Sequence, residues 1–330
     1  YVDTINRALE RGWSKENIGG HLIRNNHISH CEQTGIVGSM GAVFSTVANN
    51  TISDIHVRAL FGGAEMAAIK FHGAIDTVIS GNHIYRATRG IWLDWMTQGT
   101  RVTRNLLHDN RPDEDLFVEV NQGPFLIDNN IMLSPQGVLV NSHGGAYAHN
   151  LIGGKVHVMH HEKRLTPYHK GHTTEVAGLN GNPSGDDRYY NNILTGGGLA
   201  AYDEATLPVY MNGNVFLNGS KASKHEPRPT EDDEPDPGLK LLEKPDGVVL
   251  EITVDRAWAT ERRKVVTSEL LGNATTPALG YEQADGTPYR IIRDYLGNER
   301  NPGNPCPGPF ELTAGGRHSL KVWPISLSKA

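Results

Sequence analysis

Apolar and polar residues alternate in short runs along the chain, and two of these runs carry a carboxylate where strands rarely have one. The runs are IWLDW (residues 91–95) and LFVEV (residues 116–120). Alternation with a period of two places successive side chains on opposite faces of a strand. The core face then takes Ile91, Leu93 and Trp95 from the first run and Leu116, Val118 and Val120 from the second, which leaves Trp92, Asp94, Phe117 and Glu119 on the outer face.

A second pattern recurs: an asparagine followed two positions later by an aliphatic or aromatic residue. It occurs at Asn26, Asn50, Asn82, Asn105, Asn129, Asn150, Asn191 and Asn214. Successive spacings are 24, 32, 23, 24, 21, 41 and 23 residues, so five of the seven lie between 21 and 24. Ordinary β-turns are also rich in asparagine, but they would not account for the fixed period or for the apolar residue that follows.

A period in the low twenties, without helical segments between the strands, predicts an all-β fold: a right-handed parallel β-helix, or solenoid. We expect each asparagine to occupy a turn position with positive φ and to stack in a hydrogen-bonded ladder. The apolar residue after it should point into the coil. The two long spacings predict loop insertions after Asn50 and after Asn150, and such loops often carry function.

The asparagine repeat ends near residue 220, which predicts two parts. Residues 1–220 form the coils with the functional face, and residues 221–330 form a linker and a C-terminal segment that packs along the helix or caps it. The chain opens with YVDTINRALERGWS rather than with Met. We therefore expect an N-terminal part of the protein to be missing from this sequence.

Aligning the coils stacks polar residues in one outer column. The column contains His72, Asp94, Glu119 and Asn141 on four consecutive coils. Neighbouring rungs are about 4.8 Å apart, so two stacked carboxylates repel each other and one tends to keep its proton near neutral pH. Solenoid faces often carry solvated acids, but directly stacked acids cost stability. Each acid also has an aromatic neighbour, Trp92 or Phe117, and aromatic rings beside paired acids are typical of a sugar-binding cleft.

The separation of one rung bears on the chemistry that such a pair could perform. Retaining glycosidases hold two carboxyl groups about 5–5.5 Å apart, whereas inverting enzymes need about 6.5–9.5 Å to fit a water molecule. Adjacent rungs match the retaining case.

Composition excludes several other classes. A net charge of −6 and a pI near 6.2 argue against nucleic acid or an anionic membrane as a partner, and no apolar run is long enough to span a membrane. Two cysteines, Cys31 and Cys306, make no disulfide framework and indicate free thiols in a reducing compartment. A cytoplasmic location is expected, with secretion left open by the missing N-terminus. We expect Cys31 to be a core thiol.

The segments GIWLDWMTQGTRVTRNLLHDN and DLFVEVNQGPFLIDNN resemble glycoside hydrolase family 120, the β-xylosidases built on a right-handed parallel β-helix. The resemblance extends from about Gly19 to the C-terminus. It implies that Asp94 is the nucleophile, that Glu119 is the general acid/base, and that Glu65 in GGAEMAAIKFHG holds the sugar in the first subsite. It also implies release of xylose from the non-reducing end of xylo-oligosaccharides with net retention, without metal or other cofactor. Family members are considerably longer and carry a β-sandwich that is absent here.

The second insertion contains five histidines, at positions 157, 160, 161, 169 and 172, without the spacing of a metal site. We expect this loop to fold over the cleft, with Arg164, His169 and His172 contacting sugar hydroxyls. His72 either contacts Asp94 or the substrate, or has a structural place in the column.

Two other functions stay open. Parallel β-helices also serve as polysaccharide lyases on uronates, which use a Lys or Arg base and often Ca²⁺; Lys70 and Arg101 lie near the acids. The chain could instead be a non-catalytic carbohydrate-binding β-helix, in which the acids are surface decoration. The sequence leaves the oligomeric state open, including a homo-oligomer.

Overall fold

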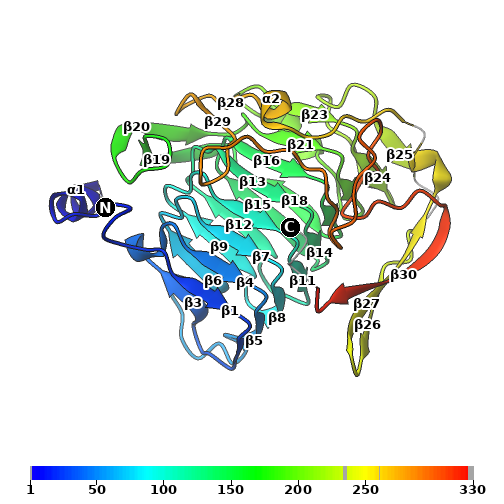
Figure 1. Cartoon of the computed structure of the whole chain (residues 1–330), viewed down its shortest axis with the longest axis horizontal. Coiled ribbons are helices and arrows are strands. Elements are labelled where there is room, and N and C mark those ends of the chain that lie inside the picture. The colour runs from blue at the N-terminus through cyan, green and yellow to red at the C-terminus, as the bar shows by residue number, and fades with distance from the viewer. Residues whose placement is uncertain (1, 233–235, 260, 326–330) are drawn as a thin grey trace.

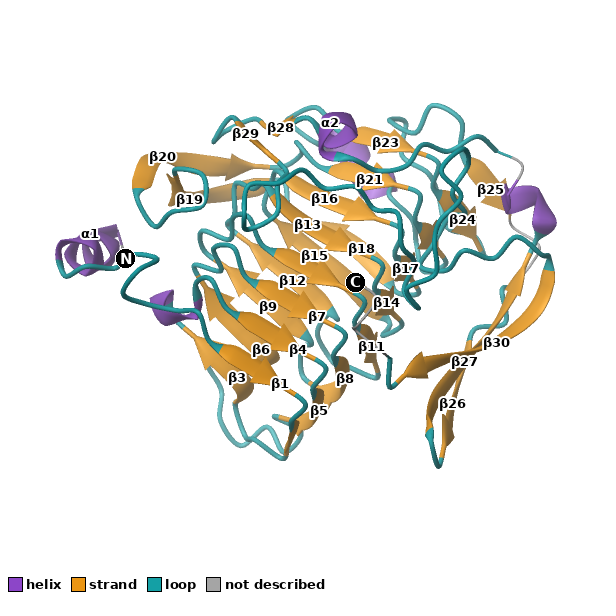
Figure 2. Ribbon diagram, in the orientation of Figure 1, coloured by secondary structure: helices purple, strands orange, loops and turns teal. Residues whose placement is uncertain are grey.

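The computed structural model describes residues 2–232, 236–259 and 261–325. As predicted, the chain folds into a right-handed parallel β-helix (Figure 1). Three parallel sheets form its sides, and Figure 2 shows the loops that turn the chain from one sheet to the next. None of the helices in the described part of the chain is both long and apolar enough to cross a membrane.

The sheets are named A, B and C in the order in which each coil visits them. In spatial order, sheet A contains β1 (Leu22–Arg24), β4 (Thr46–Ala48), β7 (Val78–Ser80), β10 (Arg101–Thr103), β13 (Phe125–Asp128), β16 (Gly145–Ala148), β21 (Arg188–Tyr190) and β23 (Tyr210–Asn212). Sheet B contains β2 (His27–Ser29), β5 (Thr51–Ile55), β8 (His83–Ala87), β11 (Leu106–His108), β14 (Ile131–Met132), β17 (Leu151–Ile152), β22 (Ile193–Leu194), β24 (Val215–Leu217) and β25 (Thr230–Asp232). Sheet C contains β3 (Thr34–Gly38), β6 (Ala67–His72), β9 (Ile91–Asp94), β12 (Leu116–Glu119), β15 (Gln136–Asn141) and β18 (Lys155–Val158).

The remaining elements decorate the coils. They are α1 (Val2–Glu10), η1 (Met40–Ala42), β19 (His161–His169), β20 (Val176–Pro183), η2 (Ala200–Glu204), β26 (Lys240–Lys244), β27 (Gly247–Val254), η3 (Arg256–Ala259), α2 (Ser268–Leu271), β28 (Asn273–Ala274), β29 (Leu279–Gly280) and β30 (Gly316–Trp323). The second insertion forms the antiparallel hairpin β19–β20. Near the C-terminus, β26, β27 and β30 form a small antiparallel sheet.

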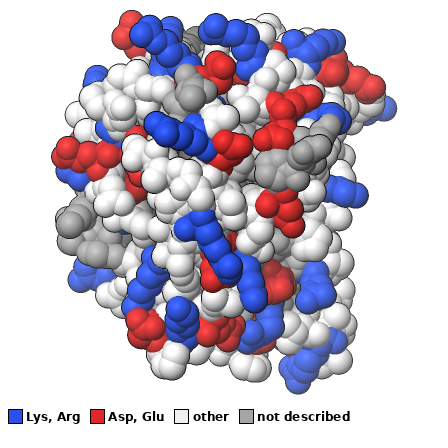
Figure 3. Space-filling view, turned by 90° about the vertical axis from the view of Figure 1, so that its right-hand side faces the viewer, with Lys and Arg blue, Asp and Glu red and all other residues white. Residues whose placement is uncertain are grey.

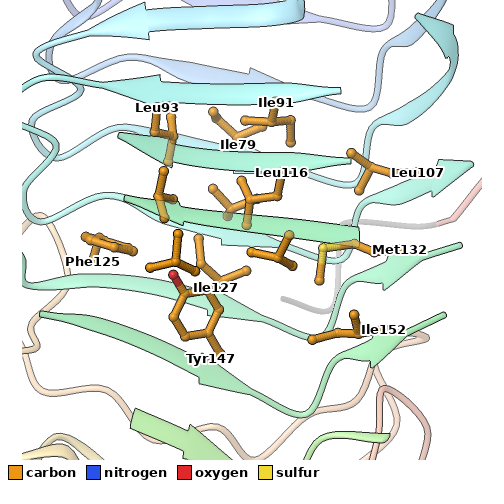
Figure 4. Packing of buried hydrophobic residues seen from close by; sticks show 14 of the residues in the cluster. Ile79, Ile91, Leu93, Leu107, Leu116, Phe125, Ile127, Met132, Tyr147 and Ile152 are labelled. Atoms are coloured by element: carbon orange, nitrogen blue, oxygen red, sulfur yellow. The ribbon is translucent and has the colours of Figure 1, made fainter. Parts of the chain in front are cut away.

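The interior of the coil is filled by stacked aliphatic and aromatic side chains (Figure 4). Ile91 and Leu93 from β9 lie against Leu116 from β12, as the alternation predicts, because every second side chain of a strand points to the same face. The prediction for Trp95 is wrong. The strand ends at Asp94, and Trp95 has a φ of 41°, so its half-buried ring packs beside the cluster around Trp13 instead of in the coil.

The asparagine ladder exists, but its register differs from the prediction at two rungs. Its members are Asn26, Asn50, Asn82, Asn105, Asn130, Asn150, Asn192 and Asn214. Each of the first seven donates from both its backbone N and its Nδ2 to the Oδ1 of the next; from Asn105 to Asn130 the two distances are 3.0 and 2.9 Å. The last, Asn214, donates from the same two atoms to Glu226. Asn129 and Asn191 were therefore misassigned by one residue.

Positive φ belongs to the residue before each ladder asparagine, and not to the ladder asparagine itself. Asn49 has a φ of 55°, Asn129 of 54° and Asn191 of 57°. The left-handed residue turns the chain, and the ladder asparagine then leads into the strand of sheet B. In the NNI segments either asparagine could take either place, which is why the sequence pattern alone chose wrongly.

The C-terminal segment packs against the outer face of sheet B. Leu106, Leu151 and Val215 on the coils share a buried cluster with Leu250 of β27 and Trp258 of η3. Both cysteines are free thiols; Cys306 is buried, and Cys31 is half-buried against the core.

Candidate active site

The predicted column of polar residues is confirmed by the register of sheet C. His72 pairs with Asp94, Asp94 with Glu119, and Glu119 with Asn141 on successive parallel strands. All four lie on the face opposite the core residues of the same strands. The two carboxylates are therefore one rung apart, which is about 4.8 Å in a parallel sheet.

Neighbouring side chains hold the carboxylate of Asp94 through only one of its two oxygens. Oδ2 accepts a hydrogen bond of 2.9 Å from Lys70 Nζ, and His72 Nε2 lies 2.9 Å from the same oxygen. The side chain of Asp94 is only 6% exposed. Oδ1 is buried and has no hydrogen-bond partner among the described residues. Oδ1 is therefore the oxygen of Asp94 that none of the described residues holds.

The place of Lys70 beside the carboxylates of this site is not predicted from the sequence, which singles Lys70 out only as a possible base for a lyase. Its side chain is fully buried, and Nζ donates to Glu65 Oε2 at 2.6 Å as well as to Asp94. The same atom lies 3.7 Å from the centroid of the Trp92 ring. The sequence does contain a sign of this role: Lys70 stands two residues before His72, so both side chains point to the outward face of the strand.

The ring of Trp92, which the sequence predicts to bind substrate, packs largely against protein groups. Its ring stacks on Phe117 at 5.4 Å between centroids and is flanked by the cations of Lys70 and Arg89, so that only 9% of the residue is exposed. Its Nε1 donates a hydrogen bond of 3.0 Å to Glu119 Oε2. Trp92 therefore positions the second carboxylate.

Glu119 is held at both oxygens and is only 13% exposed at its side chain. Arg164 donates from Nη2 to Oε1 at 2.6 Å, and Trp92 donates to Oε2. Burial raises the pKa of Glu119, and the negative charge of Asp94 raises it further, while the bonds from Arg164 and Trp92 oppose the shift. A carboxyl group with a raised pKa beside an ionised one is the arrangement that separates an acid from a nucleophile.

The hairpin β19–β20 brings Arg164 into the site. Its Nη2 bonds both Glu119 and Glu162 at 2.6 Å, so the guanidinium contacts carboxylates, where sugar hydroxyls were expected as its partners. The hydrogen bond from Arg164 lowers the pKa of Glu162 to about 2. Asn141, the last member of the column, donates to Glu162 Oε2 at 2.9 Å and so connects the hairpin to the coil.

The two histidines that the sequence predicts to contact sugar hydroxyls, His169 and His172, do not contact the carboxylate pair and are held by other protein groups. His169 is buried, its backbone N donates to Gln98 Oε1, and burial lowers its pKa to about 4. His172 Nδ1 lies 3.0 Å from the carboxylate of Asp76 and its Nε2 3.3 Å from Glu282. Both anchor the end of the hairpin where a turn joins β19 to β20, and their partners Gln98 and Asp76 are distant in sequence. Within the described ranges, no group of three or more His, Cys, Asp or Glu side chains is arranged to hold a metal ion.

Comparison with known proteins supports the fold and adds one close structural neighbour. Residues 12–152 match the family model of a right-handed β-helix region. The structure of XylC in complex with xylose superposes with a TM-score of 0.92 and 37% identity over 97% of this chain. The chain is similar to XylC. It spans 54% of the XylC chain, so about half of that protein has no counterpart here. Among curated proteins, no sequence matches.

Proposed function

We propose that the chain is the catalytic part of a retaining, exo-acting glycoside hydrolase that releases xylose from the non-reducing end of xylo-oligosaccharides. The observation that carries the proposal is the register of Asp94 with Glu119 on adjacent rungs. That separation suits direct attack by a carboxylate and leaves too little room for an intervening water molecule. The likeness to XylC, a protein whose structure holds xylose, supports the choice of sugar.

In the first step, Asp94 Oδ1 attacks the anomeric carbon while Glu119 gives its proton to the leaving oxygen. Lys70 and His72 hold the other oxygen of Asp94, which fixes the carboxylate and leaves Oδ1 as the nucleophilic atom. The raised pKa of Glu119 favours the protonated form that this step requires. The glycosidic C–O bond breaks, and a covalent glycosyl-enzyme forms.

In the second step, ionised Glu119 takes a proton from a water molecule, which attacks the anomeric carbon and displaces Asp94. Two displacements restore the original configuration of the sugar. Arg164 bonds the carboxylate form of Glu119, so the same group serves as acid and then as base. Glu65, whose side chain is 32% exposed beside Lys70, is positioned to accept hydrogen bonds from sugar hydroxyls.

The lyase alternative loses its two candidate bases. Lys70 is fully buried, and its Nζ is engaged as a donor to two carboxylates, so it is not placed to reach a substrate as a free base. Arg101 is bonded to Asp128 in sheet A, on another side of the coil. Absence of new ultraviolet absorbance on uronate polymers would remove this alternative, because a lyase product carries a new double bond.

The experiment is hydrolysis of p-nitrophenyl β-D-xyloside by the wild type and by the Asp94→Ala and Glu119→Ala variants. Each substitution should lower kcat/KM by at least about a thousandfold, because nucleophile and acid act in the transition state. Azide should rescue Asp94→Ala and give a xylosyl azide of inverted configuration. Glu175→Ala, which removes an exposed carboxylate from the end of the hairpin, is the control and should keep full activity. Full activity in both Asp94→Ala and Glu119→Ala would refute the proposal.

A further inference from the structure

A separate concavity lies on the outer face of β21 and β23, at the end of sheet A and away from the catalytic column of sheet C. Its volume is about 630 Å³, enough for a small ligand. The floor comes from Tyr190, Tyr210 and Asn212, whose side chains face away from the coil. Its walls come from two distant segments, residues 225–228 and 262–264.

The walls are basic. Positively charged or titratable side chains are contributed by His225, Arg228, Arg262, Arg263 and Lys264, and no Asp or Glu lines the cavity. Within the described ranges, Arg228, Arg262 and Lys264 take part in no ion pair with an acid. The protein as a whole carries a net charge of −6, and the face at the right-hand end of the molecule mixes both signs of charge (Figure 3). The lining therefore differs from the average surface of this protein.

Gathering like charges in one lining costs free energy, so a cavity of this kind needs a reason. Two acids of the described residues act on Arg263 without lining the cavity: Glu261, which is exposed, and Glu226, which is buried and bonded to Asn214 at the end of the asparagine ladder. Burial raises the pKa of Glu226 to about 7, so near neutral pH it supplies only part of a negative charge. These two acids offset only part of the charge that the four Arg and Lys side chains bring to the lining, so a bound anion would offset more of it.

Arg263 gives a second, independent observation. It is 3% exposed, and its Nε donates to the carbonyl oxygen of Gly213 at 2.8 Å, which fixes the guanidinium in the wall. Its Nη2 has no hydrogen-bond partner among the described residues. A buried guanidinium with an unused donor is typical of a place that receives a carboxylate or phosphate oxygen, after a small adjustment that opens the donor to the ligand.

The two tyrosines indicate what kind of anion fits. Tyr210 is 44% exposed, with the guanidinium of Arg188 4.9 Å from its ring centroid, and Tyr190 lines the cavity beside it. Aromatic surface next to fixed cations suits a ligand that has both a ring and a negative charge. We propose that this cavity is a second carbohydrate site, for a sugar that carries a carboxylate, such as a uronate-bearing oligosaccharide. The site is independent of the proposed catalysis, because binding alone can test it.

Calorimetric titration tests the proposal in the Glu119→Gln variant, which prevents turnover. The ligand is xylotriose carrying a glucuronate group, titrated in the presence of saturating neutral xylotriose so that the catalytic column is already occupied. Binding should persist, weaken as salt is raised, and become at least about tenfold weaker in the double variant Arg262→Glu/Lys264→Glu. Lys240→Glu reverses an exposed charge on β26 and should leave binding unchanged.

The outcomes separate this proposal from its alternatives. No heat with the acidic sugar, or equal binding in the double variant, would overturn it. Inorganic phosphate that binds as tightly as the uronate sugar would make the cavity a simple anion site and overturn the carbohydrate part. Absence of xyloside hydrolysis in the wild type, with uronate binding intact, would count against the proposed catalysis and leave this site standing.

Discussion

At the scale of single residues, the central feature is a lysine enclosed by two carboxylates. Lys70 Nζ is fully buried and bonds Glu65 and Asp94, and the ring of Trp92 covers it. Burial of the charged groups of Lys70 and Asp94 is tolerated only because each has a partner. Lys70 holds one oxygen of Asp94. The position of the Asp94 carboxylate therefore depends on a residue that neither attacks the sugar nor transfers a proton.

We therefore expect Lys70→Met to lower kcat for the xyloside by about a hundredfold or more, because Asp94 loses the donor that orients it. The variant should also unfold more easily, since two carboxylates then lie side by side without a cation. Kinetics and urea unfolding measure the two effects. Lys155→Met removes an exposed lysine from β18 of the same sheet, and it should change neither. Unaltered kcat in folded Lys70→Met would show that Lys70 has no positioning role.

The pH dependence of activity should depend on Arg164. The proposed first step needs protonated Glu119, so activity falls as pH rises through the raised pKa of that group. The bond from Arg164 lowers this pKa, and Arg164→Met should therefore shift the alkaline limb of the kcat profile to higher pH while reducing kcat itself. Lys163→Met, at an exposed neighbouring position, should leave the limb in place. An alkaline limb that moved to lower pH would contradict this account of the site.

At the scale of elements, the asparagine ladder joins one coil to the next. Asn105 is fully buried; it accepts from Asn82 and donates to Asn130 and to two carbonyl oxygens. Asn26 at the beginning of the ladder is exposed, and its described side-chain bonds are only two. The ladder therefore satisfies polar groups inside the turns that would otherwise be buried without partners.

Asn105→Ala should lower the free energy of unfolding by about 2–4 kcal/mol, because several buried groups lose their partners at once. Asn26→Ala should cost less than about 1 kcal/mol, since water can replace the lost bonds at an exposed end. Urea unfolding of both variants makes the comparison. An equal loss of unfolding free energy in the two variants would mean that burial of a ladder asparagine does not determine its contribution to stability.

At the scale of the whole molecule, the C-terminal segment covers a face of sheet B that would otherwise expose apolar side chains. Leu250 is fully buried against Leu106, Leu151 and their neighbours on the coils. We propose that coils and C-terminal segment unfold as one cooperative unit, since a shared core couples them.

Leu250→Ala should then lower the free energy of unfolding of the entire chain by about 2–5 kcal/mol. The chain should still unfold in a single transition, with a lower midpoint temperature. Leu60→Ala, at a side chain in the first insertion that is 65% exposed, should cost less than about 0.5 kcal/mol. Thermal unfolding followed by circular dichroism measures both. A separate early transition that alone responds to Leu250→Ala would show that the C-terminal segment is an independent unit.

The sequence by itself determined the fold and the pairing of the two acids. A period in the low twenties implies stacked coils, and alternation within a strand fixes which residues face outward, so Asp94 and Glu119 follow from local rules. Local rules failed where two asparagines stand side by side, because either Asn129 or Asn130 satisfies the same pattern.

Only the tertiary structure decided what surrounds the acids. Whether the outward ring of Trp92 is open depends on Lys70 and Arg89, which reach it from neighbouring parts of the coil. The hairpin places Arg164 on Glu119 across 45 residues of sequence, while His172 from the same insertion goes to Asp76. Such contacts depend on the way in which long side chains and loops fold over the coil. Neither the asparagine repeat nor the alternation within strands predicts where these groups end.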